Sequence, residues 1–317
     1  MTEIVADAGP AEEGPAGLDP RRVLLFRDVV RAGSISAAAR ARGWTQPALS
    51  QHLAALERSI GTPLLLRGAG GVRPTDAGRL LLARADTIAG ELHLAAEELA
   101  AVAGGRRGRV RIAAYPSGAA TLLPRALAAL QATRPDLDVA VVEAEPPEAL
   151  AALEAGEVDL ALVFDYDGDL RPGPPDDRGG RTRVALGEEP VDLVLPPGHP
   201  LADVVPLRLA DLADAPWIVG CARCRRHTDE RCAQAGFVPR VRHVSDDYVV
   251  VQRLVALGVG VSLLPRSALE AYRAPEVVVR ADPALGSRGY GVVLRTGALA
   301  GPAVAALVAE LRAAAEH

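Results

Sequence analysis

A long apolar repeat from Thr75 to about Ala103 constrains the fold of this 317-residue chain more than any other feature. Its apolar residues recur at alternating steps of four and three, which is the spacing of a coiled-coil seam. We therefore expect one long helix that pairs with another chain. A helix that packs on its own domain is the alternative, which the narrow stripe disfavours. The expected seam residues are Leu81, Ala85, Ile88, Leu92, Ala95 and Leu99, continued by Val102.

Three short helices and a β-hairpin are expected before this repeat. The helices close at Gly33, near Gly43 and at Gly61, because glycine is the common residue at a helix C-terminus. The third helix has Thr45 as its N-cap and an inward apolar face formed by Leu49, Leu53, Leu56 and Ile60. Its opposite face is therefore expected to be exposed. The hairpin covers residues 64–73 and has a glycine-rich tip.

Strands and helices alternate after Gly104-Gly105, which is expected to be a hinge. Short β runs alternate with amphipathic helices, and this order indicates a parallel sheet. A Pro/Gly/Asp-rich loop at 167–182 precedes a second set that begins near Val191. The pattern predicts an α/β fold with two lobes, and the cleft between the strand ends is the usual ligand position in such sheets.

Charge is distributed unevenly along the chain. Residues 18–80 contain ten Arg and four acidic residues, a net charge of +6, whereas the remainder carries −11. Such asymmetry is typical of a small nucleic-acid-binding module attached to a larger acidic body, although a merely solvated basic face gives the same count.

Composition and motifs exclude several protein classes. No apolar run approaches the roughly 20 residues that cross a bilayer, and the acidic, Pro/Gly-rich residues 1–17 are expected to be a disordered tail rather than a signal peptide. Three cysteines are too few for a secreted disulfide scaffold and favour the cytoplasm. We find no catalytic triad, phosphate loop or paired carboxylates at a useful spacing, so we expect neither an enzyme nor a bound cofactor or metal.

The segment from Ser34 to Gly78 resembles the winged helix-turn-helix of LysR-type transcriptional regulators. The resemblance rests on Ser34, Ser36, Ala38-Ala39, Gln46-Pro47-Ala48-Leu49-Ser50, Leu56-Glu57, Gly61, Pro63-Leu64, Arg67, Thr75 and Gly78. The remainder is similar to the two-lobed, periplasmic-binding-protein-like effector domain of that family, through Leu122-Leu123-Pro124, Asp159-Leu160-Ala161 and Gly258 to Pro265. A match of this many residues at fixed spacing is a specific signal.

This resemblance implies a domain organisation and a function. It places a winged helix-turn-helix at 18–76, a linker and dimerisation helix at 77–105 and an effector domain at 106–317. Lobe I would cover about 106–165 and 266–317, and lobe II about 166–265. The chain would be a cytoplasmic homodimer or homotetramer that binds double-stranded promoter DNA under the control of a small-molecule effector.

The resemblance also implies the residues that contact DNA. A recognition helix presents its first two turns to the major groove, and Gln can pair with adenine through two hydrogen bonds. Gln46 is the candidate for base readout, whereas Thr45 and Ser50 are expected at phosphate or sugar, with helix capping as the alternative. The complete set is Thr45, Gln46, Pro47, Ser50, Gln51, Arg67 and Arg73.

The effector residues carry over in the same way. They are Ser117, Gly118, Glu145, Phe164, Asp165, Cys221 and Asp246. A loop hydroxyl and backbone amides at a helix N-terminus suit a carboxylate ligand, with simple capping as the alternative for Ser117. Glu145 and Asp165 would favour a cationic or hydroxyl-bearing ligand instead.

One further cluster is unusual, because Cys221, Cys224, His227 and Cys232 lie within twelve positions. Three thiolates and an imidazole suit tetrahedral zinc, and a Cys-x-x-Cys at a helix N-terminus can sense oxidants. Structural or pocket-lining cysteines are the third possibility. The alternative function is therefore a transcriptional regulator that responds to redox state or to metal.

Overall fold

A computed structural model describes residues 18–68, 71–102, 108–170, 176–178 and 181–316. These residues form two compact units, divided within the long helix at about Ala96. The expected acidic tail at 1–17 and the expected hinge at Gly104-Gly105 lie outside the described residues. No helix in the described ranges is long and apolar enough to cross a membrane.

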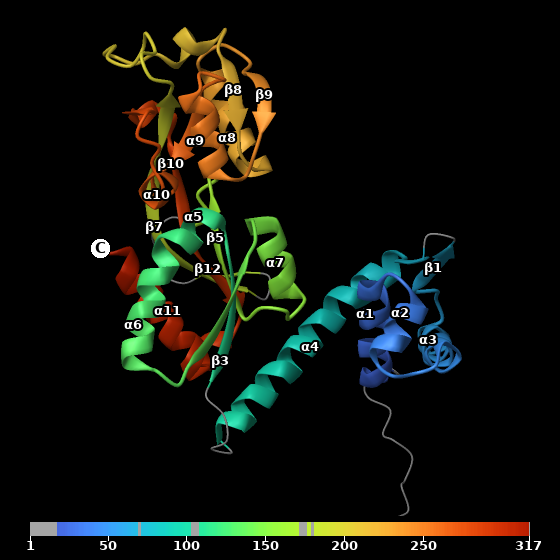
Figure 1. The fold of residues 1–317 in the computed structure, drawn as a ribbon. Coiled ribbons are helices and arrows are strands. Elements are labelled where there is room, and N and C mark those ends of the chain that lie inside the picture. The colour runs from blue at the N-terminus through green and yellow to red at the C-terminus, as the bar shows by residue number, and fades with distance from the viewer. Residues whose placement is uncertain (1–17, 69–70, 103–107, 171–175, 179–180, 317) are drawn as a thin grey trace, which may run out of the picture. The chain divides into compact units, whose positions relative to one another are not determined.

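The N-terminal unit is a small helical module with a two-stranded wing (Figure 1). Its elements are α1 (Pro20–Ala32), α2 (Ile35–Ala41), α3 (Gln46–Ile60), β1 (Leu65–Gly68), β2 (Gly71–Pro74) and the first part of α4 (Asp76–Val102). Gly33 and Gly61 adopt left-handed φ angles of 65° and 78° at the ends of α1 and α3, as expected from their positions. The core consists mainly of Phe26, Val29, Leu49, Leu53, Leu56 and Leu64, all fully or almost fully buried.

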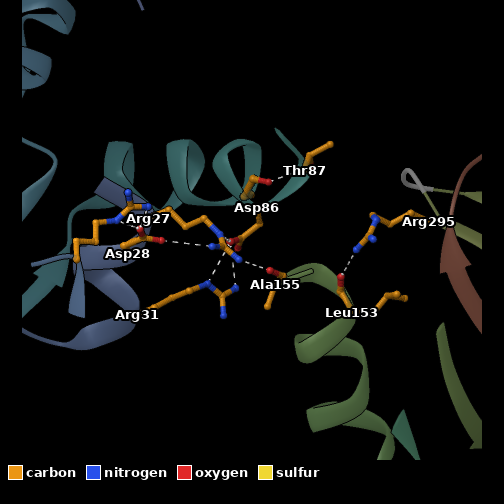
Figure 2. Close-up of polar contacts among 10 residues, drawn as sticks. Arg27, Asp28, Arg31, Asp86, Thr87, Leu153, Ala155 and Arg295 are labelled. Carbon is orange, nitrogen blue, oxygen red and sulfur yellow. Dashed lines mark hydrogen bonds and ion pairs between the residues drawn. The ribbon is translucent and has the colours of Figure 1, made fainter. Parts of the chain in front are cut away.

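An ionic contact fastens α4 to α1 inside this unit (Figure 2). The Asp86 carboxylate accepts a hydrogen bond of 2.7 Å from Arg27 Nε and one of 3.0 Å from Arg31 Nη2. Asp86 is 8% exposed, and the adjacent Ala85 joins the module's apolar core. The first turns of α4 are therefore an integral part of the N-terminal unit.

The first lobe of the C-terminal unit is built on a mixed sheet (Figure 1). Parallel β4 (Asp138–Glu143), β3 (Arg109–Ala114) and β5 (Leu160–Asp165) continue into antiparallel β12 (Ser287–Arg295), β7 (Arg181–Leu195) and the short β6 (Asp176–Arg178). Helices α6 (Leu122–Thr133) and α11 (Pro302–Ala315) pack on one face, and α7 (Pro146–Glu154) packs on the other. The five-residue α5 (Pro116–Ala120) follows β3.

The second lobe continues the same sheet through the far end of β7. This end pairs with β10 (Ser262–Pro265) and β11 (Val278–Ala281), while β8 (Pro216–Val219) pairs with β9 (Arg240–Val244) and meets Val261 beside β10. Helices α8 (Ala222–Gln234), α9 (Tyr248–Ala256) and α10 (Arg266–Ala271) complete the lobe, with short 3-10 turns at Leu209–Leu212 and Pro283–Leu285. A third 3-10 turn, Ala298–Ala300, lies in the first lobe between β12 and α11. The α/β two-lobed fold is thus confirmed.

Two boundaries differ from those expected. A loop was predicted through residue 182, but β7 begins at Arg181, and Thr182 and Val184 are buried against the first lobe. Arginines at alternate positions lower the apolar content of this strand and hide it from a hydrophobicity pattern. In addition, the second lobe was expected to end at about residue 265, but α10 packs into the apolar core of that lobe through Leu269, and Val278–Ala281 pairs with the end of β7 there.

Candidate functional sites

The N-terminal face of α3 carries the first group of candidate residues. Thr45, Gln46, Pro47 and Gln51 are exposed and Ser50 is half-buried, above the buried Leu49 and Leu53. Gln46 Nε2 donates a 3.2 Å hydrogen bond to Ser50 Oγ. Thr45 is the N-cap residue but makes no side-chain capping bond, so its hydroxyl is available to a ligand.

Two aromatic rings beside this face were not expected there. Trp44, directly before the N-cap, is 42% exposed, and its ring centroid lies 5.4 Å from that of His52 on α3. Exposed tryptophan is uncommon in soluble proteins and often marks a binding surface. The sequence signal for this surface is a large aromatic residue in the turn before the third helix.

The wing carries two further candidate residues for DNA binding, both of them arginines. Arg67 on β1 and Arg73 on β2 are both exposed. The Val72 N–H donates a 2.9 Å hydrogen bond to Gly33 O, which fastens the hairpin to the turn between α1 and α2. Gly71 has a φ of 103°, and a Cβ there would lie 2.3 Å from Gly33 O, so this contact requires glycine. Residues 69–70 at the tip lie outside the described ranges.

The apolar stripe of α4 divides into two parts. Leu81 and Ala85 pack against the core of their own module, as in the alternative reading of the repeat. Further along, Ile88, Leu92 and Leu99 are 36%, 54% and 70% exposed, and Ala95 is also exposed. Within the described part of the stripe, it is therefore the second part that is left uncovered.

A cavity lies between the two lobes of the C-terminal unit. The space that water-sized molecules can occupy in it is about 50 Å³, and the cavity is open to solvent. The first lobe contributes the segment after β3, the start of α7, the end of β5 and one side chain of β12. The second lobe contributes the N-terminus of α8, the start of α9 with the loop before it, β10 and α10. The polar side chains in the walls include Ser117, Glu145, Cys221, Cys224, Asp246 and Arg288, together with Tyr115, Ser245 and Tyr248.

Arg288 is the central polar residue of this cavity, and sequence reasoning did not identify it. Its side chain is 2% exposed; Nε donates to Glu189 Oε1 at 2.8 Å and Nη2 donates to Ser117 Oγ at 2.7 Å. Its guanidinium carbon lies 4.2 Å from the ring centroid of Phe164 and 4.9 Å from that of Tyr115. A buried cation that is paired, stacked and hydrogen-bonded can hold a ligand without moving.

The structure brings five of the seven expected effector residues to the cavity wall. These are Ser117, Glu145, Phe164, Cys221 and Asp246. Gly118 lies behind the wall, where an added Cβ would be 2.6 Å from the Tyr115 ring. Asp165 is turned away, because its Oδ1 accepts the backbone N–H groups of Gly168 and Asp169 at 2.6 and 3.2 Å.

Glu145 has an unusual protonation state. Burial first, and then the adjacent Cys221 and Asp246, raise its pKa from the ordinary 4.5 to about 8. Its Oε2 is buried and has no hydrogen-bond partner among the described residues. At neutral pH the carboxyl group is therefore largely protonated and adds no full negative charge to the cavity.

The free energy of unfolding should consequently fall as pH rises from about 4.5 to about 8. In that window the unfolded chain releases a proton that the folded chain retains, so unfolding becomes more favourable with increasing pH. We expect Glu145→Gln to remove this decline and to gain about 2 kcal/mol at pH 8.5, after allowance for partial solvent screening. Urea titrations at several pH values measure it, with the exposed Glu148→Gln as the control. An unchanged pH profile in Glu145→Gln contradicts the prediction.

The cysteine cluster does not form a four-ligand site. Cys232 is fully buried in the second-lobe core beside Trp217. His227 Nε2 lies 2.8 Å from Leu285 O, and its ring stacks on Tyr166 with centroids 4.2 Å apart. No group of three or more Cys, His, Asp or Glu side chains in the described ranges could hold a metal ion. The alternative of a metal-sensing tetrad therefore finds no support in the described residues, because the helix directs its members to different neighbours.

Comparisons with known proteins cover almost the whole chain. The family model described as "Bacterial regulatory helix-turn-helix protein, lysR family" matches residues 20–79. The model described as "LysR substrate binding domain" matches residues 103–316. These ranges contain the α3 face and the cavity, respectively.

Individual relatives agree with these matches. A small neutral protease regulatory protein of Streptomyces coelicolor is 33% identical over 251 residues, which cover 76% of this chain and 71% of that protein. A probable HTH-type transcriptional regulator, LrrA, of Synechococcus elongatus is 31% identical over 291 residues, covering 91% and 94%. A full-length OxyR variant from Pseudomonas aeruginosa has the same fold, with a TM-score of 0.67 and 20% identity over 93% of this chain and 95% of that one.

Proposed function

The chain belongs to the LysR family of DNA-binding transcriptional regulators, and from this premise we propose that a small organic anion in the cavity between its lobes controls its binding to promoter DNA. The observation that carries the proposal is the hydrogen bond from Arg288 to Ser117 in the cavity wall. The proposal assigns the chain a regulatory role in the cytoplasm and no catalytic one.

Ser117 is oriented to donate a hydrogen bond into the cavity. A guanidinium group has only donors, so Ser117 Oγ must accept from Arg288, and its own hydrogen points elsewhere. No acceptor in the described part of the chain takes this hydrogen. The positive charge of Arg288 polarises the Ser117 hydroxyl group. Arg288 Nη1 makes no hydrogen bond to any residue in the described part of the chain. A carboxylate fits this pair of donors.

Asp246 and Glu145, which line other parts of the cavity wall, narrow this class of ligand further. Asp246 lines the second-lobe side, and the largely protonated Glu145 can donate as well as accept. We propose that the effector carries a carboxylate at the Arg288 end and a hydroxyl or amino group toward Asp246. Binding both lobes at once would favour their closure.

The DNA-binding proposal places α3 in the major groove. Gln46 would read a base edge, Thr45 and Ser50 would contact phosphate or sugar, and Arg67 and Arg73 of the wing would neutralise phosphates. Pro47 and Gln51 complete the contact face. Trp44 joins the expected set, since its ring is exposed at the entrance of the helix.

We propose that α4 forms the dimer through its uncovered part. The seam would consist of Ile88, Leu92, Ala95 and Leu99, and the partly buried Leu81 could extend it toward the module. Ala85, which the repeat places in the seam, is fully buried in its own module and has no surface left for a partner. A dimer would present two recognition helices to a nearly palindromic site, and a tetramer would add a second pair.

A Ser117→Ala substitution tests the effector site. We expect a panel of hydroxy and amino carboxylates screened by thermal shift to contain stabilising ligands, and the variant to bind them roughly 10- to 100-fold more weakly, the loss typical of a hydrogen bond to a charged group. Calorimetric titration gives the dissociation constants. Footprinting of the DNA upstream of the gene, with and without each hit, then tests whether the ligand alters promoter binding.

Ser267→Ala is the matched control for this experiment. Ser267 Oγ also accepts from Arg288 Nη2, at 3.1 Å, but its side chain does not line the cavity between the lobes. It should retain the ligand affinity of the unmodified chain. Equal losses in both variants, or hits confined to cations, would contradict an anion site at Ser117.

A redox-responsive regulator is the second candidate function. The close approach of Cys221 and Cys224 in the cavity wall favours it.

A further inference from the structure

Two cysteines approach each other at the edge of the cavity between the lobes. Cys221 is the N-cap residue of α8, and Cys224 lies in the first turn of that helix. Their Sγ atoms are 2.9 Å apart, and both residues line the cavity. A disulfide bond is about 2.0 Å long, so the sulfurs need to move together by less than about 1 Å to form one.

The surroundings of the pair favour the thiolate form at Cys224 over that at Cys221. Tyr166 Oη donates to Cys224 Sγ at 3.8 Å. The hydrogen bond from the Cys221 thiol is the main cause that lowers the pKa of Cys224, and Arg288 and Tyr166 lower it further, against the opposing effect of burial. The same hydrogen bond, together with burial, raises the pKa of Cys221. Of the two cysteines, Cys224 therefore ionises the more readily, and Cys221 keeps its proton the longer.

The third cysteine has none of these features. Cys232 is fully buried in the apolar core of the second lobe, and burial raises its pKa to about 12. A thiol of this kind is unreactive at neutral pH, because the thiolate is the nucleophile.

We propose that Cys221 and Cys224 form a redox-active dithiol site whose oxidising substrate is a small hydroperoxide. Cys224 is the attacking thiolate and Cys221 is the resolving thiol. The site lies in the wall of the cavity assigned above to the effector, but its chemistry does not depend on that assignment. A peroxide of two or three heavy atoms can reach Cys224 through the same opening.

The chemical steps balance with the hydroperoxide as the only oxidant. The Cys224 thiolate attacks the terminal peroxide oxygen and breaks the O–O bond, which forms a sulfenic acid and, after protonation, releases an alcohol, or water in the case of hydrogen peroxide. Cys221 then loses its proton and attacks the Cys224 sulfur, forming the S–S bond and releasing water. Two thiols give up two electrons and two protons in total, and the peroxide takes up both.

Disulfide formation changes the electrostatics of the cavity. The negative charge on Cys224 disappears, so the attraction that it exerts on Arg288 is lost. The Cys221 thiol no longer interacts with Glu145, which removes one of the causes that raise the pKa of that carboxyl group. Oxidation would thus make the cavity more attractive to anions.

Thiol counting on the full-length chain tests the proposal. The reduced protein is exposed to hydrogen peroxide at about fivefold excess, quenched with catalase, denatured and labelled with a thiol-specific mass tag. We expect three labelled cysteines to fall to one and dithiothreitol to restore three. Because Arg223 separates the two cysteines, trypsin cleaves between them, and the Cys221–Cys224 disulfide is identified as a pair of linked peptides.

Three variants assign the roles. Cys224→Ser should lose thiols at least about 10-fold more slowly than the unmodified chain. Cys221→Ser should oxidise at Cys224 to a sulfenic acid that dimedone traps, with no intramolecular disulfide. In Cys232→Ala, the number of labelled cysteines should fall from two to none after exposure to peroxide.

Different results would overturn the proposal. As a reference, the peroxide dose is one that oxidises most of an equal amount of free cysteine. If all three thiols of the protein survive this dose, a reactive dithiol is excluded. A disulfide that includes Cys232, or equal rates in Cys224→Ser and the unmodified chain, would exclude the assignment. None of these measurements involves DNA or an effector, so a failure here is distinguishable from a failure of the proposed regulatory function.

Discussion

Replacing Arg288 by Met is expected to destabilise the C-terminal unit by about 3–5 kcal/mol, the cost of leaving a buried carboxylate without its cation. Glu189 lies under the guanidinium with 9% of its side chain exposed, and the ion pair between them measures 2.8 Å. Its remaining interactions come from the Ser267 N–H at 2.6 Å and the Ser267 hydroxyl at 3.1 Å, which do not neutralise its charge. Urea unfolding followed by circular dichroism measures the effect.

Two further variants separate the lost charge pair from lost packing. Arg288→Met combined with Glu189→Gln should recover most of the stability, since neither charge then remains. Arg125→Met changes an exposed arginine of the same lobe and should alter the free energy of unfolding by about 0.5 kcal/mol or less. A double variant as unstable as the single one would show that packing against Phe164 and Tyr115, rather than the ion pair, is responsible.

Gln46→Ala is expected to weaken binding to the specific promoter site by about 1–3 kcal/mol, a loss of roughly 5- to 150-fold, while affinity for random duplex DNA changes little. The exposed amide contributes nothing to the core, and its hydrogen bond to Ser50 links two surface residues, so the thermal midpoint should remain unchanged. Fluorescence anisotropy at one fixed salt concentration measures both affinities.

Gln131→Ala provides the matched control for this change. Gln131 is exposed on α6 in the C-terminal unit, and its replacement should leave both affinities unaltered. An equal loss on specific and random DNA in Gln46→Ala would assign Gln46 to backbone contact instead of base readout.

The local elements were largely predictable because each depends on neighbouring residues. Left-handed glycines closed α1 and α3 where expected, and the inward stripe of Leu49, Leu53 and Leu56 is fully buried. Ser117 and Glu145 likewise follow directly after β3 and β4, at the strand ends where ligands bind in such sheets.

Arg288 could not be predicted in the same way. It is 171 positions from Ser117, and only the pairing of β12 between β5 and β7 brings the two together. A single arginine in a late strand has no sequence pattern that reveals its partner. The prediction of a single cysteine and histidine site was misled for the opposite reason, because its members are close along the sequence. Successive positions of a helix point in different directions, so His227 and Cys232 contact other neighbours.

The attachment of α4 to α1 has a mechanical consequence. With Asp86 held by both Arg27 and Arg31, and Ala85 set in the apolar interior beside it, the first turns of the long helix cannot rotate about their axis independently of the rest of the module. The first turns of α4 therefore move with α3 as parts of one module. In the dimer proposed above, a twist between two paired α4 helices would change the separation of the two recognition helices.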